Sequence, residues 1–130
     1  FVNSLKLLQI RKIISNSSYF TKNEVHEFIN IINKLNEICK RKNINFYFVY
    51  LPTYEAMIDK AKNKSNINNK QIIFKFLETK NIPFIDIKSE MLKQNINPKN
   101  FYPFGLHGHF NKLGNEIIIN SLIKEFKLYD

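Results

Sequence analysis

The strongest pattern of apolar and polar positions begins at Thr21 and predicts a long helix. The segment 21–24 (Thr-Lys-Asn-Glu) matches a capping box, in which the Thr and Glu side chains satisfy backbone N–H groups at a helix start. Apolar residues then recur at steps of three and four, which places them on one helix face. They are Val25, Phe28, Ile29, Ile32, Leu35, Ile38 and Cys39. We expect this helix to end near Lys42.

Two short runs of β-branched and aromatic residues predict strands. Residues 44–51 (Ile-Asn-Phe-Tyr-Phe-Val-Tyr-Leu) form the first run, and residues 83–87 (Pro-Phe-Ile-Asp-Ile) form the second. The first run is almost continuously apolar, which favours a strand buried on both faces of a parallel sheet.

Helical and irregular segments alternate with these strands. We expect a helical opening at 5–14, a short helix at 55–61, a polar loop at 63–69, a helix at 71–80, a helical turn at 89–94, an irregular segment at 95–110 and a final helix from Asn111. Strands that alternate with helices imply right-handed crossovers and a parallel sheet with helices on its faces. Residues 1–130 contain no repeat or linker, so we expect one domain or part of one. Two strands leave open sheet edges, so we expect a second copy, a partner or further strands to pair with them.

Composition is that of a globular domain, but the charge is strongly positive. Of the 130 residues, 44% are hydrophobic and 24% are charged, with a net charge of +9. Such a balance can indicate binding to nucleic acid or to an anionic membrane. However, 18 of the basic residues are Lys and only 2 are Arg, and Lys, Asn and Ile together make up 57 residues. A nucleic-acid-binding domain more often carries Arg in a concentrated stripe. We therefore expect a compositional bias, lysines spread over the surface and no nucleic-acid partner.

The single cysteine and the apolar runs exclude several classes of protein. Cys39 alone excludes an internal disulfide framework and a Cys-rich zinc module, and its place on the apolar stripe indicates an inert structural thiol. No apolar run approaches the ~20 residues that a membrane span needs, so we expect no span in this chain. Since the chain begins with Phe1 and not Met, we expect a fragment or a processed form of a longer protein.

Candidate chemistry concentrates in the long segment before the final helix. In open parallel sheets, ligands bind beyond the carboxyl ends of the strands, and this segment follows the second predicted strand. It carries His107 and His109, and a loop histidine is a candidate general base. We expect Asn111 to cap the final helix, and Gly108 and Gly114 to permit close backbone approach.

Other chemistry has weaker support. His107-x-His109 with Asp86 as a conceivable third ligand is a weak metal pattern, so we expect no metal. His26, on the long helix, indicates a surface or structural role. No serine lies in a strand–turn–helix context, so no nucleophile is evident.

The block around His109 carries a family resemblance. Segment 108–115 (Gly-His-Phe-Asn-Lys-Leu-Gly-Asn), followed by an apolar helix, resembles the last conserved block of SGNH/GDSL-type hydrolases. Segments 44–52 and 82–87 resemble the strands that precede that block, and the resemblance covers roughly residues 21–126. It implies an α/β, flavodoxin-like three-layer sandwich with parallel strands, of which this chain is the C-terminal portion.

The resemblance implies an esterase or O-acyl transferase without a cofactor, acting on a small ester such as an O-acetyl group on a glycan. His109 would be the general base, His107 would orient it or contact substrate, Asn111 would support the loop, and Tyr102 would line the pocket. Asp86 would be structural.

Two departures from the family limit this expectation. The Gly-Asp-Ser block with the family's nucleophile, and its oxyanion-hole Gly and Asn, are absent from the sequence. His107 and Leu106 stand where the family's acid usually lies. We therefore expect this chain alone to be inactive. The alternative is a non-catalytic α/β binding or assembly module on the same skeleton, and an upstream Gly-Asp-Ser block would favour the enzyme.

Overall fold

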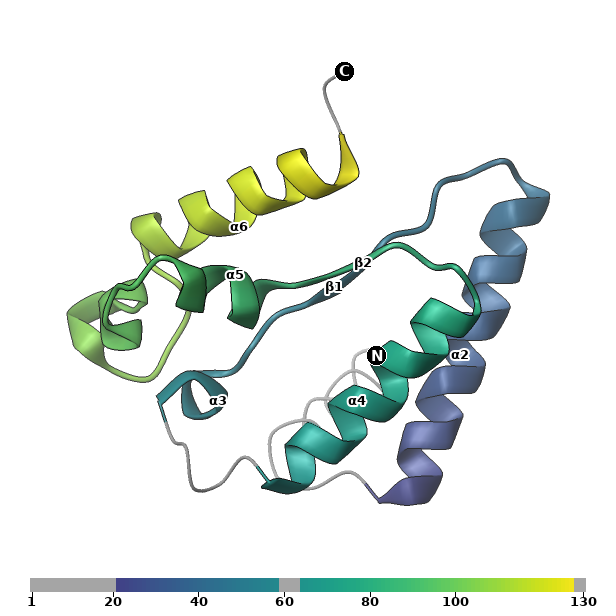
Figure 1. Cartoon of the computed structure of the whole chain (residues 1–130), viewed down its shortest axis with the longest axis horizontal. Coiled ribbons are helices and arrows are strands. Elements are labelled where there is room, and N and C mark those ends of the chain that lie inside the picture. Colours follow the sequence, from purple (N-terminus) through teal and green to yellow (C-terminus); the bar gives the residue numbers. More distant parts are fainter. Residues whose placement is uncertain (1–20, 59–63, 128–130) are drawn as a thin grey trace, which may run out of the picture.

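The computed structural model describes residues 21–58 and 64–127, and the predicted helical opening at 5–14 lies outside them (Figure 1). The elements along the chain are α2 (Lys22–Arg41), β1 (Phe48–Tyr50), α3 (Tyr54–Ile58), α4 (Lys64–Thr79), β2 (Phe84–Asp86), α5 (Ile87–Lys93), the 3-10 turns η1 (Pro98–Phe101) and η2 (Pro103–Gly105), and α6 (Lys112–Phe126).

The start of α2 confirms the predicted capping box. The Thr21 hydroxyl accepts a hydrogen bond from the Glu24 N–H at 3.3 Å, and the Glu24 carboxylate accepts one from the Thr21 N–H at 2.6 Å. These bonds to Thr21 lower the pKa of Glu24. The helix ends at Arg41, as predicted. Asn43 follows in the left-handed region at φ 55°, a conformation that Asn tolerates better than most residues.

The two strands form a parallel pair, which confirms a mixed α/β fold with parallel strands. Phe48 lies opposite Phe84, and Tyr50 lies opposite Asp86. Each strand has three residues, so the predictions of strands over 44–51 and 83–87 were too long. The physical reason is the absence of further strands: within the described sheet each strand has a single neighbour, so the flanking residues have no ladder to join.

Alternate residues of the β1 segment face different helices. Tyr47 and Val49 pack toward α5 and α6, whereas Phe46 and Phe48 pack toward α2 and α4, as the period of two predicts. The residues of β1 are half-buried, so the expectation of a strand fully buried on both faces was wrong. Figure 1 shows α2 and α4 together on one side of the strand pair and α6 on the other.

The core is divided between these two sides. The larger cluster joins β2, α3, α5, η1 and α6 and consists of Met57, Ile85, Ile87, Met91, Phe101, Tyr102 and Phe126. The smaller cluster joins α2 to the end of α4 and to the start of β2 through Ile32, Leu77 and Ile82. The larger cluster includes Phe101 and Tyr102, so it anchors the start of the histidine-bearing loop in the core.

Three helices begin earlier than the sequence predicts: α3 at Tyr54, α4 at Lys64 and α5 at Ile87. Helix α4 begins at Lys64, so the polar loop expected at 63–69 is wrong from residue 64 onward. The segment 64–69 lacks an apolar stripe, but the helix needs none there once Leu77, which is fully buried, anchors its other end. Among the described residues, none of the helices has the length and apolarity that a membrane crossing requires.

Candidate functional site

The segment between α5 and α6 is held by its own short turns. Phe101, at the end of η1, is fully buried, and the Tyr54 hydroxyl of α3 donates a hydrogen bond to the Gly105 carbonyl at 2.8 Å. Phe104 and Gly105 both adopt left-handed backbone angles, at φ 55° and 69°. The chain therefore reverses direction there and carries the following residues along the surface. The predicted irregular segment is confirmed.

His109 is an exposed residue of this loop, close to the start of α6. Its exposure was expected of a general base. A histidine that acts as a base also needs a partner that orients its ring. Within residues 21–58 and 64–127, neither a hydrogen bond nor an ion pair holds the imidazole.

His107 is the histidine that has a carboxylate partner. Its Nε2 atom lies 3.0 Å from Oε1 of Glu55, at the start of α3, and both side chains are mostly exposed. Its ring also packs edge-on against Tyr54, with ring centroids 5.7 Å apart. The carboxylate–imidazole pair of this loop is therefore Glu55–His107. The expected role of His107 in orienting His109 has no contact to support it in the part of the chain described.

Asn111 caps α6 as predicted. Its side-chain oxygen accepts from the Gly114 N–H at 3.0 Å, and its amide donates to the Asn100 carbonyl at 2.8 Å. The Asn111 N–H also donates to the Phe101 carbonyl at 2.8 Å. One residue thus ties the helix start to η1, and this fixes the backbone two residues after His109.

The two glycines of the block behave differently. A Cβ atom at position 114 would lie 3.0 Å from both the Phe101 carbonyl oxygen and the Phe110 Cβ, so Gly114 does permit a close approach. A Cβ atom at position 108 would meet nothing within 4 Å. The expectation for Gly108 was therefore wrong, because the loop is open to solvent there.

Tyr102 belongs to the core and not to the loop surface. Its side chain is 3% exposed, and it packs between Tyr54 and Phe110, with ring centroids 4.9 and 5.1 Å away. Its hydroxyl is buried with no hydrogen-bond partner in the structure. Burial first, and then the charge of Glu55, raise the pKa of Tyr102 to about 12. Tyr102 was expected to line the pocket, but in the structure its side chain is buried and packs against other aromatic rings.

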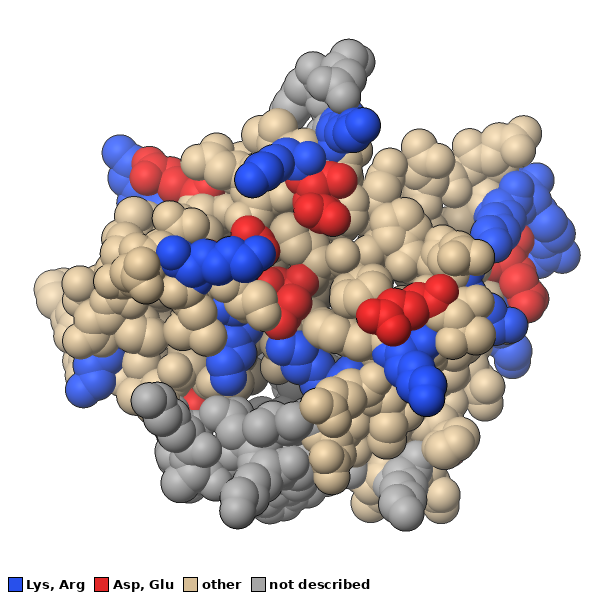
Figure 2. All heavy atoms as spheres, in the orientation of Figure 1, with Lys and Arg blue, Asp and Glu red and all other residues tan. Residues whose placement is uncertain are grey.

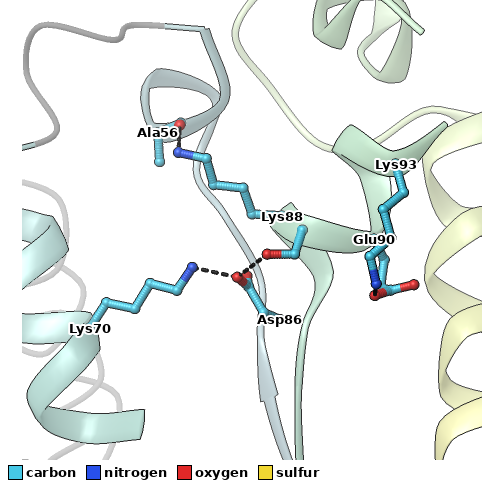
Figure 3. Close-up of polar contacts among 7 residues, drawn as sticks. Ala56, Lys70, Asp86, Lys88, Glu90 and Lys93 are labelled. Atoms are coloured by element: carbon cyan, nitrogen blue, oxygen red, sulfur yellow. Dashed lines mark hydrogen bonds and ion pairs between the residues drawn. The ribbon is translucent and has the colours of Figure 1, made fainter. Parts of the chain in front are cut away.

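A second polar cluster lies where β2 ends (Figure 3). The Asp86 carboxylate accepts hydrogen bonds from the Lys70 ammonium of α4 and from the Ser89 hydroxyl, at 2.5 and 2.6 Å. Its other oxygen is buried and has no partner. The Lys70 ammonium also lies 4.8 Å from the centre of the Tyr50 ring. Asp86 thus pairs with Lys70, as a structural role would require, and within the described residues it does not gather with the histidines as a third ligand would.

Lys88 brings a further cation to the same place. Its ammonium donates to the Ala56 carbonyl, at the other edge of the cluster. Burial lowers the pKa of Lys88, with a smaller lowering from the nearby Lys70 charge. Burial, followed by the Asp86 charge, raises the pKa of Tyr50. The cluster is therefore half-buried, and each of its two ammonium groups donates a hydrogen bond within the fold.

One hollow of about 340 Å³ lies between α5 and α6. Polar side chains dominate its wall, among them Glu90 and Lys93, which form an ion pair. None of the histidines lines it. It is thus separate from the histidine-bearing loop.

The other expectations concern metal, thiol and charge. Among the residues that the structure describes, no three His, Cys, Asp or Glu side chains gather as metal ligands would. Cys39 is a free, half-buried thiol. On the face shown in Figure 2, Lys and Arg occupy several separate places with Asp and Glu between them, as compositional bias predicts.

Comparison with protein-family models, with curated proteins and with solved structures finds no match to this chain. The candidate site is therefore described from the geometry of this chain alone. The sequence did not predict Glu55 and Lys70 as partners of His107 and Asp86. No local signal marks them, since each pair joins segments far apart in the sequence and forms only when the chain folds.

Proposed function

We propose that this chain is the histidine-bearing C-terminal part of an SGNH/GDSL-like hydrolase with a flavodoxin-like three-layer sandwich. Its reaction is the cleavage or transfer of a small ester, such as an O-acetyl group on a glycan. The observation that carries the proposal is the presentation of His109: an exposed imidazole on a loop whose exit is fixed by the Asn111 cap and by the tight packing of Gly114. These two contacts give a physical reason for the His-x-Asn-x-x-Gly spacing.

In this reaction His109 acts as the general base. The neutral imidazole takes the proton of an attacking hydroxyl and returns it to the departing alkoxide. Because Asn111 and Gly114 hold the backbone and not the ring, the imidazole remains accessible from solvent. The hydroxyl nucleophile comes from outside the residues described here.

A non-catalytic binding module is the second candidate, and one observation favours it. Glu55 pairs with His107, and no carboxylate in the described segments contacts His109. A base without an orienting acid is a weaker catalyst, because the acid fixes the tautomer and stabilises the imidazolium.

Acetate release by the natural full-length protein tests the proposal. The substrates are 4-nitrophenyl acetate and an O-acetylated glycan, and the variants are H109A, H107A and, as the matched control on α2, H26A. We expect H109A to lose at least about a hundredfold in kcat/KM, the usual contribution of a general base, and H26A to lose little. Loss in H107A alone would make Glu55–His107 the catalytic pair. Absence of turnover in the wild type, with retained glycan binding, would establish the binding module.

A further inference from the structure

The apolar residues of helix α2 were expected on one face, but the structure divides them between a buried face and a separate, exposed apolar stripe. The stripe consists of Phe28, Ile31, Leu35 and Ile38, with exposed fractions of 40, 62, 44 and 41%. The buried face carries Val25, Ile32 and Asn36. At 100° per residue, the stripe is centred roughly 100° around the helix from that face. Four large apolar side chains along one exposed line form the kind of patch that marks an interaction surface.

The spacing of the stripe is that of a helix–helix seam. Its residues follow one another at steps of three, four and three, which is the alternation of first and fourth heptad positions in a two-helix coiled coil. A helix that only covers a core needs no such second line of apolar residues. The occupant that fits it best is therefore another helix.

The charged residues beside the stripe indicate that the partner helix is α2 of a second copy of this chain. Glu27, Lys34 and Arg41 follow at seven-residue steps on the flank away from the core. In an antiparallel pair of α2 helices centred near residue 33, Ile31 packs opposite Leu35 of the partner subunit, and Glu27 meets Arg41 of the partner subunit at both ends. In a parallel pair the same flank meets the side that holds Ile32, which faces its own core. The same arrangement sets Lys34 against Lys34 of the partner subunit near the axis, but the two Glu27–Arg41 pairs outweigh this single repulsion. Charge complementarity thus favours the antiparallel arrangement.

The stripe contacts β1, which has an open edge in the described sheet. Phe28 of α2 packs edge-on against Phe48 of β1, and Phe74 of α4 packs against both Tyr50 of β1 and Phe84 of β2. In the described sheet β1 has β2 as its neighbour on one side and no strand on the other. A two-fold axis that makes the α2 helices antiparallel also makes the two β1 strands antiparallel, so the same axis can pair their edges.

We propose that a second copy of this chain docks on the α2 stripe, with the two α2 helices antiparallel and Glu27 paired with Arg41 of the partner subunit. The interface is isologous, since each stripe is self-complementary when reversed. It covers the apolar stripe and brings together the two β1 edges.

Light scattering and sedimentation of the whole chain test whether it forms a dimer. We expect a dimer at micromolar concentration. I31D places a carboxylate at the centre of the seam and should yield a monomer with unchanged helix content by circular dichroism. A wild-type monomer up to about 100 μM would overturn the proposal, and slow amide exchange in α2 of that monomer would assign the stripe to another segment of the chain.

A charge exchange tests the antiparallel arrangement. E27R and R41E each set two like-charge pairs across the interface, and we expect each to weaken dimerisation roughly tenfold. The E27R/R41E double variant restores opposite charges and should regain most of the wild-type affinity. E37R is the matched control, because it makes the same charge change on α2 outside the flank. Failure of the double variant to recover, or an equal loss in E37R, would overturn the arrangement.

Discussion

The Nε2 atom of His107 lies 3.0 Å from the Oε1 atom of Glu55, and this contact joins the loop before α6 to α3. Both side chains are mostly exposed, so water screens the attraction and the contact adds little to stability. Asp86 differs, because its side chain is only 14% exposed and accepts from both Lys70 and Ser89. The two carboxylates therefore hold the fold to different degrees.

We expect E55Q to change the free energy of unfolding by less than about 1 kcal/mol, as exposed ion pairs do. D86N should cost roughly 1–3 kcal/mol, because it leaves the half-buried Lys70 ammonium without its counter-ion. Urea unfolding at pH 7 measures both values. Equal losses for the two variants would contradict this ranking.

The local patterns predict the helices of this fold well and its strands less well. The capping box at Thr21 and the stripe after it predict α2 because both signals lie within the helix itself. Strand length depends on neighbours, and in the described sheet the residues of 44–51 outside β1 lack a ladder to join. The period of two still predicts correctly that Phe48 and Val49 face opposite sides.

In the candidate site too, local features are predictable from the sequence and contacts between distant segments are not. Asn111 is predictable as a cap because it acts on Gly114, three residues along. The partner of His107 is Glu55, on another element, and no pattern in the loop specifies it. Burial of Tyr102 depends likewise on Tyr54 and Phe110 packing around it. Contacts between distant segments are decided by tertiary packing, which a single sequence does not display.

The glycines of the histidine block give a matched pair of variants. G114A places a Cβ atom 3.0 Å from the Phe101 carbonyl oxygen, so we expect a loss of roughly 1–3 kcal/mol in unfolding free energy. G108A meets nothing within 4 Å and should change stability by less than about 1 kcal/mol, by stiffening the unfolded chain. Thermal and urea unfolding give both values. A tolerated G114A would show that the start of α6 can shift.

The Asn111 cap predicts a graded loss of stability in a series of variants. N111A removes the acceptor for the Gly114 N–H and should cost about 1 kcal/mol, whereas N111D keeps that acceptor and should lose less. N115A is the control, because Asn115 makes only a 3.3 Å bond to the Phe110 carbonyl from an exposed position. Amide exchange should speed up in the first turn of α6 for N111A alone. Equal stability of all three variants would exclude capping as the role of Asn111.

Tyr102 makes the stability of the protein depend on alkaline pH. Its pKa is raised to about 12 from an ordinary 10.0, so between these values the folded state binds more protons than the unfolded state. Stability therefore falls as the pH rises through this window, by at most about 2–3 kcal/mol at 1.36 kcal/mol per unit. Y102F removes this component, so its unfolding free energy should decline less between pH 10 and 12.

The same variant should also stabilise the protein at neutral pH. The Tyr102 hydroxyl is buried without a partner, and Y102F removes that unsatisfied group while keeping the ring, for a gain of roughly 1 kcal/mol. Tyr54 is the matched control, because its hydroxyl donates to the Gly105 carbonyl at 2.8 Å, so Y54F should lose a similar amount. Urea unfolding at pH 7 and pH 11 separates the two effects. A Y102F variant less stable than wild type at pH 7 would mean that the Tyr102 hydroxyl has a hydrogen-bond partner in the folded protein.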